Sequence, residues 1–243
     1  MKETKNIKGY VIRVSPYKEY DAMVTILSEE GLFSFSGRGI KKNTSKNFAS
    51  CQPLCFSSFQ LTSTGTSYSL KESKLLSSSP DYSSFEKAIS LSIIEELSGK
   101  IIKDDDCEVA YEWLGSILNS LNSGLDALSM TLIYFAQLIK INGYGLNVSS
   151  CIHCGGKKNI VGVDYINGGF VCERCADKNT VIYNPETLKT VRYIFMCGLT
   201  NYKQAKFDTE ICYKLIIDLS IFLEDTLGFK LKSVETIKTM LKY

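Results

Sequence analysis

The chain has 243 residues, which exceeds one typical domain and predicts two or three modules. Hydrophobic residues make up 44%, aromatic residues 11% and charged residues 22%, a composition that excludes a disordered chain. The polar first residues do not form a signal peptide, and the apolar-rich stretch 130–141 is shorter than the roughly 20 residues of a membrane helix, so we expect a cytoplasmic protein. The net charge of +2 conceals a basic segment 1–75 (11 Lys+Arg, 6 Asp+Glu), an acidic segment 76–150 (4 and 10) and a basic segment 151–243 (13 and 10).

Short β-prone runs separated by turn residues occupy the first 73 residues. We predict five strands near 7–14, 23–27, 32–36, 54–62 and 67–72, with hairpin turns at 29–31 and 63–65 where glycine can take a positive φ. Five short antiparallel strands in about 70 residues suit a closed OB-fold barrel, because closure removes exposed edges. An SH3-like barrel satisfies the same pattern.

Helical patterns follow the Ser- and Pro-containing boundary at 77–80. The segment 83–86 fits a capping box for a helix that ends near 102, and the acidic run 104–106 opens a second helix through 121. A third helix is predicted from about 125 to 142. The pair Asn184-Pro185 starts a fourth helix that ends near 197, and two more are expected at 208–227 and from 233 to the end.

These patterns predict an α+β multidomain protein. Its parts are an OB-fold nucleic-acid-binding domain at 1–76, the first part of a helical domain at 80–150, a zinc module at 151–175 and the second part of the helical domain at 176–243.

The zinc module is predicted from two Cys-x2-Cys pairs, Cys151 with Cys154 and Cys172 with Cys175, which are separated by 17 residues. Each pair places two thiolates on one side of a turn, and together they provide tetrahedral sulfur ligation for one structural Zn2+ per chain. The remaining five cysteines have no ligand spacing, and we expect them to be small buried residues.

Other interpretations of this quartet are reduced cysteines without metal, with a redox role for one pair, and a catalytic zinc. Four thiolates leave no position for water, which counts against a catalytic ion. His153, the single histidine, could replace a thiolate or lie exposed in the first turn. No P-loop, GxGxxG or HExxH motif occurs, so no enzyme is expected.

A basic segment, 38–47, carries four positive charges and no negative one between the third and fourth predicted strands. Lysine and arginine neutralise phosphates and release counterions, and nearby aromatic residues offer surfaces on which bases can stack. Those aromatic residues are Tyr10, Tyr17, Tyr20, Phe33 and Phe35. Each feature has a simpler interpretation, a solvated turn for the lysines and a barrel core for the aromatic residues. Their combination favours nucleic-acid binding.

The order and spacing of many residues resemble the RecO recombination-mediator family along most of the chain. In the N-terminal part these are Gly9-Tyr10-Val11-Ile12-Arg13, Glu19-Tyr20-Asp21, Thr25-Ile26-Leu27, Gly31-Leu32, Gly37-Arg38-Gly39, Ser45 and Gln52-Pro53. Further along they are Cys151 to Gly155, Gly168-Gly169 before the second cysteine pair, Leu227-Gly228 and Lys230-Leu231-Lys232-Ser233.

The resemblance implies a cytoplasmic, nucleoid-associated DNA-repair and recombination mediator with an OB-fold, a helical domain and an embedded four-cysteine zinc module. It further implies binding of single- and double-stranded DNA, annealing of complementary strands and, with RecR, loading of RecA onto DNA coated by single-strand-binding protein, whose C-terminal tail such proteins contact. Carried onto this chain, the DNA-contact candidates are Arg13, Lys18, Arg38, Lys41, Lys42 and Lys46.

Three alternatives remain at this point. The first is a generic RNA-binding protein built from an OB barrel and a zinc ribbon, and the second is a protein-interaction scaffold. The third is a zinc-dependent hydrolase, against which the closed thiolate set and the single histidine count.

Overall fold

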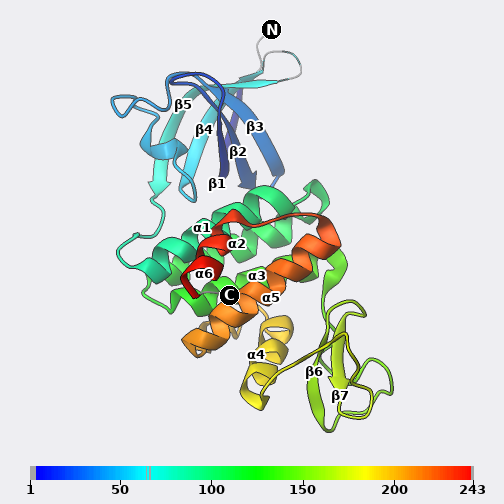
Figure 1. The fold of residues 1–243 in the computed structure, drawn as a ribbon. Coiled ribbons are helices and arrows are strands. Elements are labelled where there is room, and N and C mark those ends of the chain that lie inside the picture. The colour runs from blue at the N-terminus through cyan, green and yellow to red at the C-terminus, as the bar shows by residue number, and fades with distance from the viewer. Residues whose placement is uncertain (1–3, 64, 66, 242–243) are drawn as a thin grey trace. The chain divides into compact units, whose positions relative to one another are not determined.

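The computed structural model describes residues 4–63, 65 and 67–241 (Figure 1). The chain divides into two compact units, Met1–Ser123 and Gly124–Tyr243. The first unit contains the strands of the predicted barrel and the first two helices, and the second contains the remaining helices and the four-cysteine segment. The finer module boundaries derived from sequence stay a prediction. None of the described helices is long and apolar enough to cross a membrane.

The first unit begins with a closed barrel of five strands in the order β1-β2-β3-β5-β4, the predicted OB-fold. Its strands are β1 Thr4–Pro16, β2 Ala22–Ser28, β3 Gly31–Gly37, β4 Phe56–Ser63 and β5 Tyr68–Ser77. Neighbours pair antiparallel except β3 and β5, whose parallel pairing closes the sheet. Alternate side chains such as Val24, Ile26 and Phe35 fill the interior.

All five predicted strands exist, with shifted bounds. The fourth begins at Phe56 rather than 54, because Leu54 has a positive φ of 60° in a turn that pairs with Val11. The fifth continues to Ser77, beyond the predicted 72. The turn at 31 is confirmed by the φ of 121° at Gly31, whereas Thr64 of the other predicted turn lies outside the described residues.

Two helices, α1 Phe85–Ile101 and α2 Cys107–Asn122, pack on the barrel within the first unit. At Gly99 a Cβ would lie 2.9 Å from the carbonyl oxygen of Ile12, so only glycine allows α1 to approach β1 this closely. The predicted capping box is wrong: Ser84 is the N-cap and accepts the backbone N–H of Lys87, which places no acidic residue at the third position. The acidic run Asp104–Asp106 forms a 3-10 turn before α2.

The helices of the second unit are α3 Ala127–Ile139, α4 Pro185–Met196, α5 Thr209–Leu227 and α6 Lys232–Leu241. Every residue of α3 is buried, and a π-helical turn, Lys140–Tyr144, follows it where the sequence predicted three more helical residues. Asn184 caps α4 as predicted, since its side chain accepts the backbone N–H of Thr187 at 2.8 Å. Residues 242–243 of the last predicted helix lie outside the described part.

Between α3 and α4 lies a three-stranded sheet with the order β7-β6-β8. Its strands are β6 Ile160–Asp164, β7 Gly169–Cys172 and β8 Thr180–Ile182. The third strand was not predicted. Tyr165 and Tyr183 share a hydrogen bond of 2.9 Å, and Tyr183 donates to Asp218 of α5, so side chains join this sheet to the helices.

Candidate nucleic-acid interface and metal centre

The basic segment is joined to the turn between β1 and β2 at one end of the barrel. The backbone N–H of Gly39 donates to the Asp21 carboxylate at 2.8 Å, and that of Lys41 donates to the carbonyl of Tyr20 at 3.1 Å. Gly39 has a φ of 64°, which favours glycine and lets the loop turn back. Segments 17–21 and 38–42, which we call the barrel-end loops, therefore form one surface.

Four of the six predicted DNA-contact residues belong to the barrel-end loops and are exposed: Lys18, Arg38, Lys41 and Lys42. None of these four takes part in an ion pair among the described residues. The same loops also carry Glu19 and Asp21, so the surface holds four cations against two carboxylates and keeps a net positive charge that attracts a polyanion. This surface is the strongest candidate for phosphate contact on the barrel.

The other two predicted contacts lie elsewhere on the barrel. Lys46 pairs with Glu72 of β5 at 3.4 Å, although both groups are well exposed and the pair is weak. Arg13 lies on β1 opposite Thr25, and its Nε donates to the Ser15 hydroxyl. No described hydrogen bond or ion pair connects either residue to the barrel-end loops, so their role in DNA contact stays a prediction.

Two of the five aromatic residues considered from sequence are exposed beside these cations. Tyr17 and Tyr20 are 46% and 42% exposed, and the Nζ of Lys42 lies 4.6 Å from the centre of the Tyr20 ring. Phe35 is fully buried in the barrel. Tyr10 packs between Phe56 and Tyr111, and Phe33 lies against Tyr68 with Lys5 above its ring. Only Tyr17 and Tyr20 are therefore available as stacking surfaces in this group.

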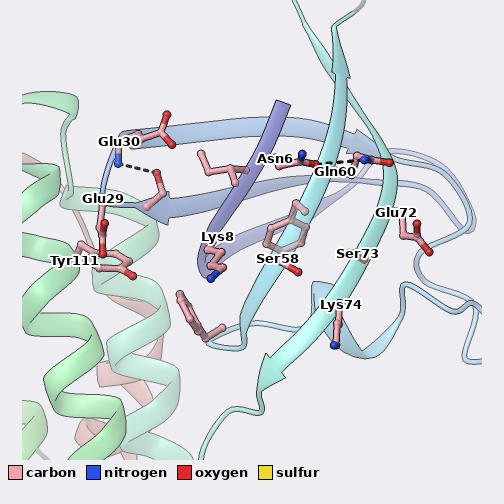
Figure 2. A pocket seen from close by; sticks show the side chains of 14 residues that line it. Asn6, Lys8, Glu29, Glu30, Ser58, Gln60, Glu72, Ser73, Lys74 and Tyr111 are labelled. Atoms are coloured by element: carbon pink, nitrogen blue, oxygen red, sulfur yellow. Dashed lines mark hydrogen bonds between the residues drawn. The ribbon is translucent and has the colours of Figure 1, made fainter. Parts of the chain in front are cut away.

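A hollow of about 1040 Å³ lies on the outer face of β1, β4 and β5 (Figure 2). None of the six predicted DNA-contact residues lines it. Lys8 and Lys74 face this hollow from two strands, and Tyr111 faces it from α2. Three glutamates also line it, so its charge is mixed. A polyanion would meet carboxylates here, which makes this face a weaker phosphate site than the barrel-end loops.

The four cysteines predicted as metal ligands come together in the second unit. Their sulfur atoms all lie within 4.8 Å of one another, and the Sγ atoms of Cys154 and Cys172 are 3.7 Å apart. A tetrahedral site with metal–sulfur distances of about 2.3 Å requires sulfur separations of about 3.8 Å. The arrangement therefore fits one tetrahedrally coordinated ion.

Backbone donors favour ionised thiols in this cluster. Burial acts to raise the pKa of Cys151, but the backbone N–H groups of Cys172, Cys154 and His153 outweigh it and lower that pKa to about 6. The N–H of Gly156 likewise lowers the pKa of Cys154. In contrast, the neighbouring thiol of Cys172 is the main cause that raises the pKa of Cys175 to about 12. Four negative charges this close repel one another strongly. A bound cation is therefore required for all four thiols to be ionised at once.

His153 is not one of the clustered ligands. Its side chain is 40% exposed, and its Nε2 lies 3.9 Å from a carboxylate oxygen of Asp164, which is completely buried. Asp164 also accepts the backbone N–H and the side-chain amide of Asn167. The placement of His153 at an exposed position is thus confirmed. The five scattered cysteines are buried, as expected.

Asp21 is the functional residue whose role the sequence analysis missed. It stood only within a motif of the family resemblance, yet its carboxylate holds the two barrel-end loops together. The only indication in the sequence was an acidic residue of the Glu19-Tyr20-Asp21 motif close to the basic residues.

The fold and the sites define a class of protein: an OB barrel followed by helices that carry an inserted cluster of four cysteines. The model of the recombination protein O N-terminal domain matches residues 1–79, and that of the C-terminal domain matches residues 82–235. The chain belongs to the RecO family.

Proteins named DNA repair protein RecO are similar over nearly their whole length. The one from Clostridium perfringens strain 13 is 27% identical over 239 residues, 95% of this chain and 96% of its own. The Bacillus subtilis protein is 25% identical over 240 residues, 96% of this chain and 93% of its own. Among solved structures, an Entamoeba histolytica asparaginyl-tRNA synthetase covers 50% of this chain and 33% of its own, with 10% identity and a TM-score of 0.28, too weak a likeness to inform fold or function.

Proposed function

We propose that this protein is a DNA-repair and recombination mediator that binds single- and double-stranded DNA through the barrel-end loops. The observation that carries the proposal is the joining of Lys18, Arg38, Lys41 and Lys42 into one exposed surface without ion-pair partners among the described residues. Membership of the RecO family and relatives named DNA repair proteins support the same function.

In this mechanism the cations hold phosphates while bases stack on Tyr17 and Tyr20, so that no covalent bond is made or broken. Binding releases counterions, and the affinity for single-stranded DNA falls with salt at a logarithmic slope of about −0.7 per neutralised phosphate. Charge and stacking together are the usual combination in proteins that bind single strands without sequence preference.

We further propose that the cysteine cluster holds one structural Zn2+, because thiolate ligands in a tetrahedral set suit zinc. When bound, the ion would offset half of the negative charge of the clustered thiolates and fix the turns that precede β6 and follow β7. The sheet contributes few buried residues of its own, chiefly Val163, Phe170 and Val171, so the ion would supply much of its folding energy. Metal analysis of the purified protein tests the identity of the ion.

The mediator role extends to partners: RecR, the C-terminal tail of single-strand-binding protein and, indirectly, RecA. Annealing of complementary oligonucleotides coated with single-strand-binding protein tests this role. A mediator anneals the coated strands, whereas a protein that binds only bare strands does not.

The barrel site is tested by Lys41→Glu combined with Lys42→Glu, measured by fluorescence anisotropy with labelled single-stranded DNA. The double variant should bind more weakly and with a flatter salt slope. Lys71→Glu, an exposed charge reversal on β5 outside the barrel-end loops, is the matched control for each single change, Lys41→Glu and Lys42→Glu. An unchanged slope in the double variant removes these loops from the site. Tighter binding to RNA than to DNA would favour the RNA-binding alternative.

A further inference from the structure

A second group of cations lies between the cysteine cluster and α4, within the second unit. A hollow of about 180 Å³ is lined by Lys157, Lys189 and Arg192. A neighbouring hollow of about 460 Å³ shares Lys157 and adds Lys158 and Arg174. The two hollows adjoin at Lys157, and we call the pair, with its five cations, the α4 groove.

The charges of the α4 groove have no ion-pair partners within the described structure. Its single acidic lining residue is Glu173, and none of the five cations takes part in an ion pair among the described residues. Ion pairs do form elsewhere in this unit, for example between Lys238 and Glu235. Four thiolates around a divalent ion retain negative charge, which offsets the cations nearest the cluster. The half beside α4 has no acidic lining residue and keeps its positive potential.

Arg192 is held in a fixed position at this half of the groove. Its Nε donates to the carbonyl of Val148 at 3.0 Å, and its guanidinium lies 5.3 Å from the centre of the Phe170 ring. No described hydrogen bond uses its two Nη groups. A guanidinium that is fixed through Nε and free at Nη matches the paired oxygens of a phosphate.

The floor of the groove beside α4 is apolar. It consists of Ile160, Phe170, Pro185 and Leu188, of which Phe170 and Leu188 are buried. Phe170 is covered by Arg192, so the accessible apolar contact for a sugar or a base comes from Ile160 and Pro185, beside cations that contact phosphates.

We propose that the α4 groove is a second nucleic-acid site, which binds the phosphate backbone of a single strand. Cations spread over two adjoining hollows match a ligand with repeated charges, and a nucleic-acid strand supplies one phosphate per nucleotide. The inference goes beyond the proposed function, which places DNA on the barrel, and it does not depend on that function. Two sites in different units allow one chain to hold two strands.

The test uses the full metal-loaded chain and a fluorescent oligothymidylate of about ten nucleotides, a length within the range that one small site covers. The variant is Lys157→Glu with Lys189→Glu, both exposed changes. The control is Lys203→Glu with Lys206→Glu, which reverses two exposed charges of the same unit outside the groove. Titration at low salt gives the number of oligonucleotides bound per chain, and a salt series gives the slope.

We expect two oligonucleotides per parent chain and per control. In the groove variant the second oligonucleotide should bind more weakly than in the control, and its salt slope should flatten by about 1.4 because two phosphate contacts are lost. The barrel variant Lys41→Glu with Lys42→Glu should lose the other oligonucleotide, so failure of one site is distinguishable from failure of the other.

The proposal is overturned if the groove variant keeps the stoichiometry and slope of the control. It is also overturned if the variant binds DNA normally but loses binding of a polyglutamate peptide, because the groove would then recognise acidic protein segments. Metal content and thermal unfolding check the fold. If the charge-reversed variant loses metal, Lys157→Gln with Lys189→Gln replaces it and should flatten the slope in the same direction.

Discussion

Asp21 offers a test that separates the geometry of the barrel-end loops from their charge. Its carboxylate accepts the backbone N–H of Gly39 and thereby holds the basic segment against the turn between β1 and β2. Asp21→Ala removes the acceptor, and Asp21→Asn keeps an oxygen acceptor at the same place. Both changes remove one negative charge from a surface proposed to bind phosphate, so electrostatics alone predicts tighter DNA binding for both variants.

The hydrogen bond involves a charged group and is half-buried, so its loss should cost about 1.5 kcal/mol of barrel stability. If the loops must be joined for Lys41 and Lys42 to act together, a similar loss in binding corresponds to about tenfold weaker affinity. We therefore expect Asp21→Ala to bind single-stranded DNA more weakly than the parent and Asp21→Asn to bind at least as tightly. Anisotropy at fixed salt measures binding, and urea unfolding measures stability. Equal strengthening in both variants would refute the role of loop geometry.

Three further changes test the fold and the metal centre. Cys172→Ser removes one metal ligand and should cost several kcal/mol of stability, measured by metal analysis and thermal unfolding; full metal retention with an unchanged melt would contradict the site. Burial raises the pKa of Asp218 above its ordinary value despite the opposing effects of Tyr183 and Lys214, so the folded state binds this proton more tightly than the unfolded state. The stabilising contribution of this proton is complete below the ordinary carboxyl pKa and is lost as the pH rises through the raised pKa of Asp218. Asp218→Asn should flatten that part of the curve of stability against pH, and an unaltered curve would contradict the role of Asp218. Gly99→Ala places a Cβ 2.9 Å from a backbone oxygen that cannot rotate away, and should cost about 1–3 kcal/mol in urea unfolding, whereas a neutral effect would mean that α1 shifts freely on β1.

The barrel was predictable because its strands are short β-prone runs separated by turn residues, a pattern that appears directly in the sequence. The start of α4 was predictable for a local reason as well, since Asn184 caps the helix through a residue three positions away. Sequence spacing also identified the four clustered cysteines. In each case the signal lies within a few residues or in a short repeated pattern.

The features that escaped prediction depend on contacts between distant residues. The three-residue strand β8 forms because it pairs with β6, and its own sequence is too short to carry a period. Which tyrosines stay exposed is likewise decided by packing: Tyr10 is covered by Phe56 and Tyr111, whereas Tyr17 and Tyr20 are not. The link from Tyr183 to Asp218 spans 35 positions and leaves no local pattern.

The mixed-charge hollow on β1, β4 and β5 is the structural rival of the barrel-end loops, because it is a hollow of about 1040 Å³ on the same barrel. Its two lysines share the surface with three glutamates, whereas the barrel-end loops carry four cations against two carboxylates, beside exposed aromatic rings. A direct map of bound DNA distinguishes the two faces.

Photo-crosslinking of the full chain to single-stranded DNA that carries 5-iodouracil tests the central claim most directly. Peptide mapping should place crosslinks on Tyr17 and Tyr20, and Lys41→Glu with Lys42→Glu should reduce them. Crosslinks at Tyr111 of α2 and Phe56 of β4, with none on the barrel-end loops, would contradict the account.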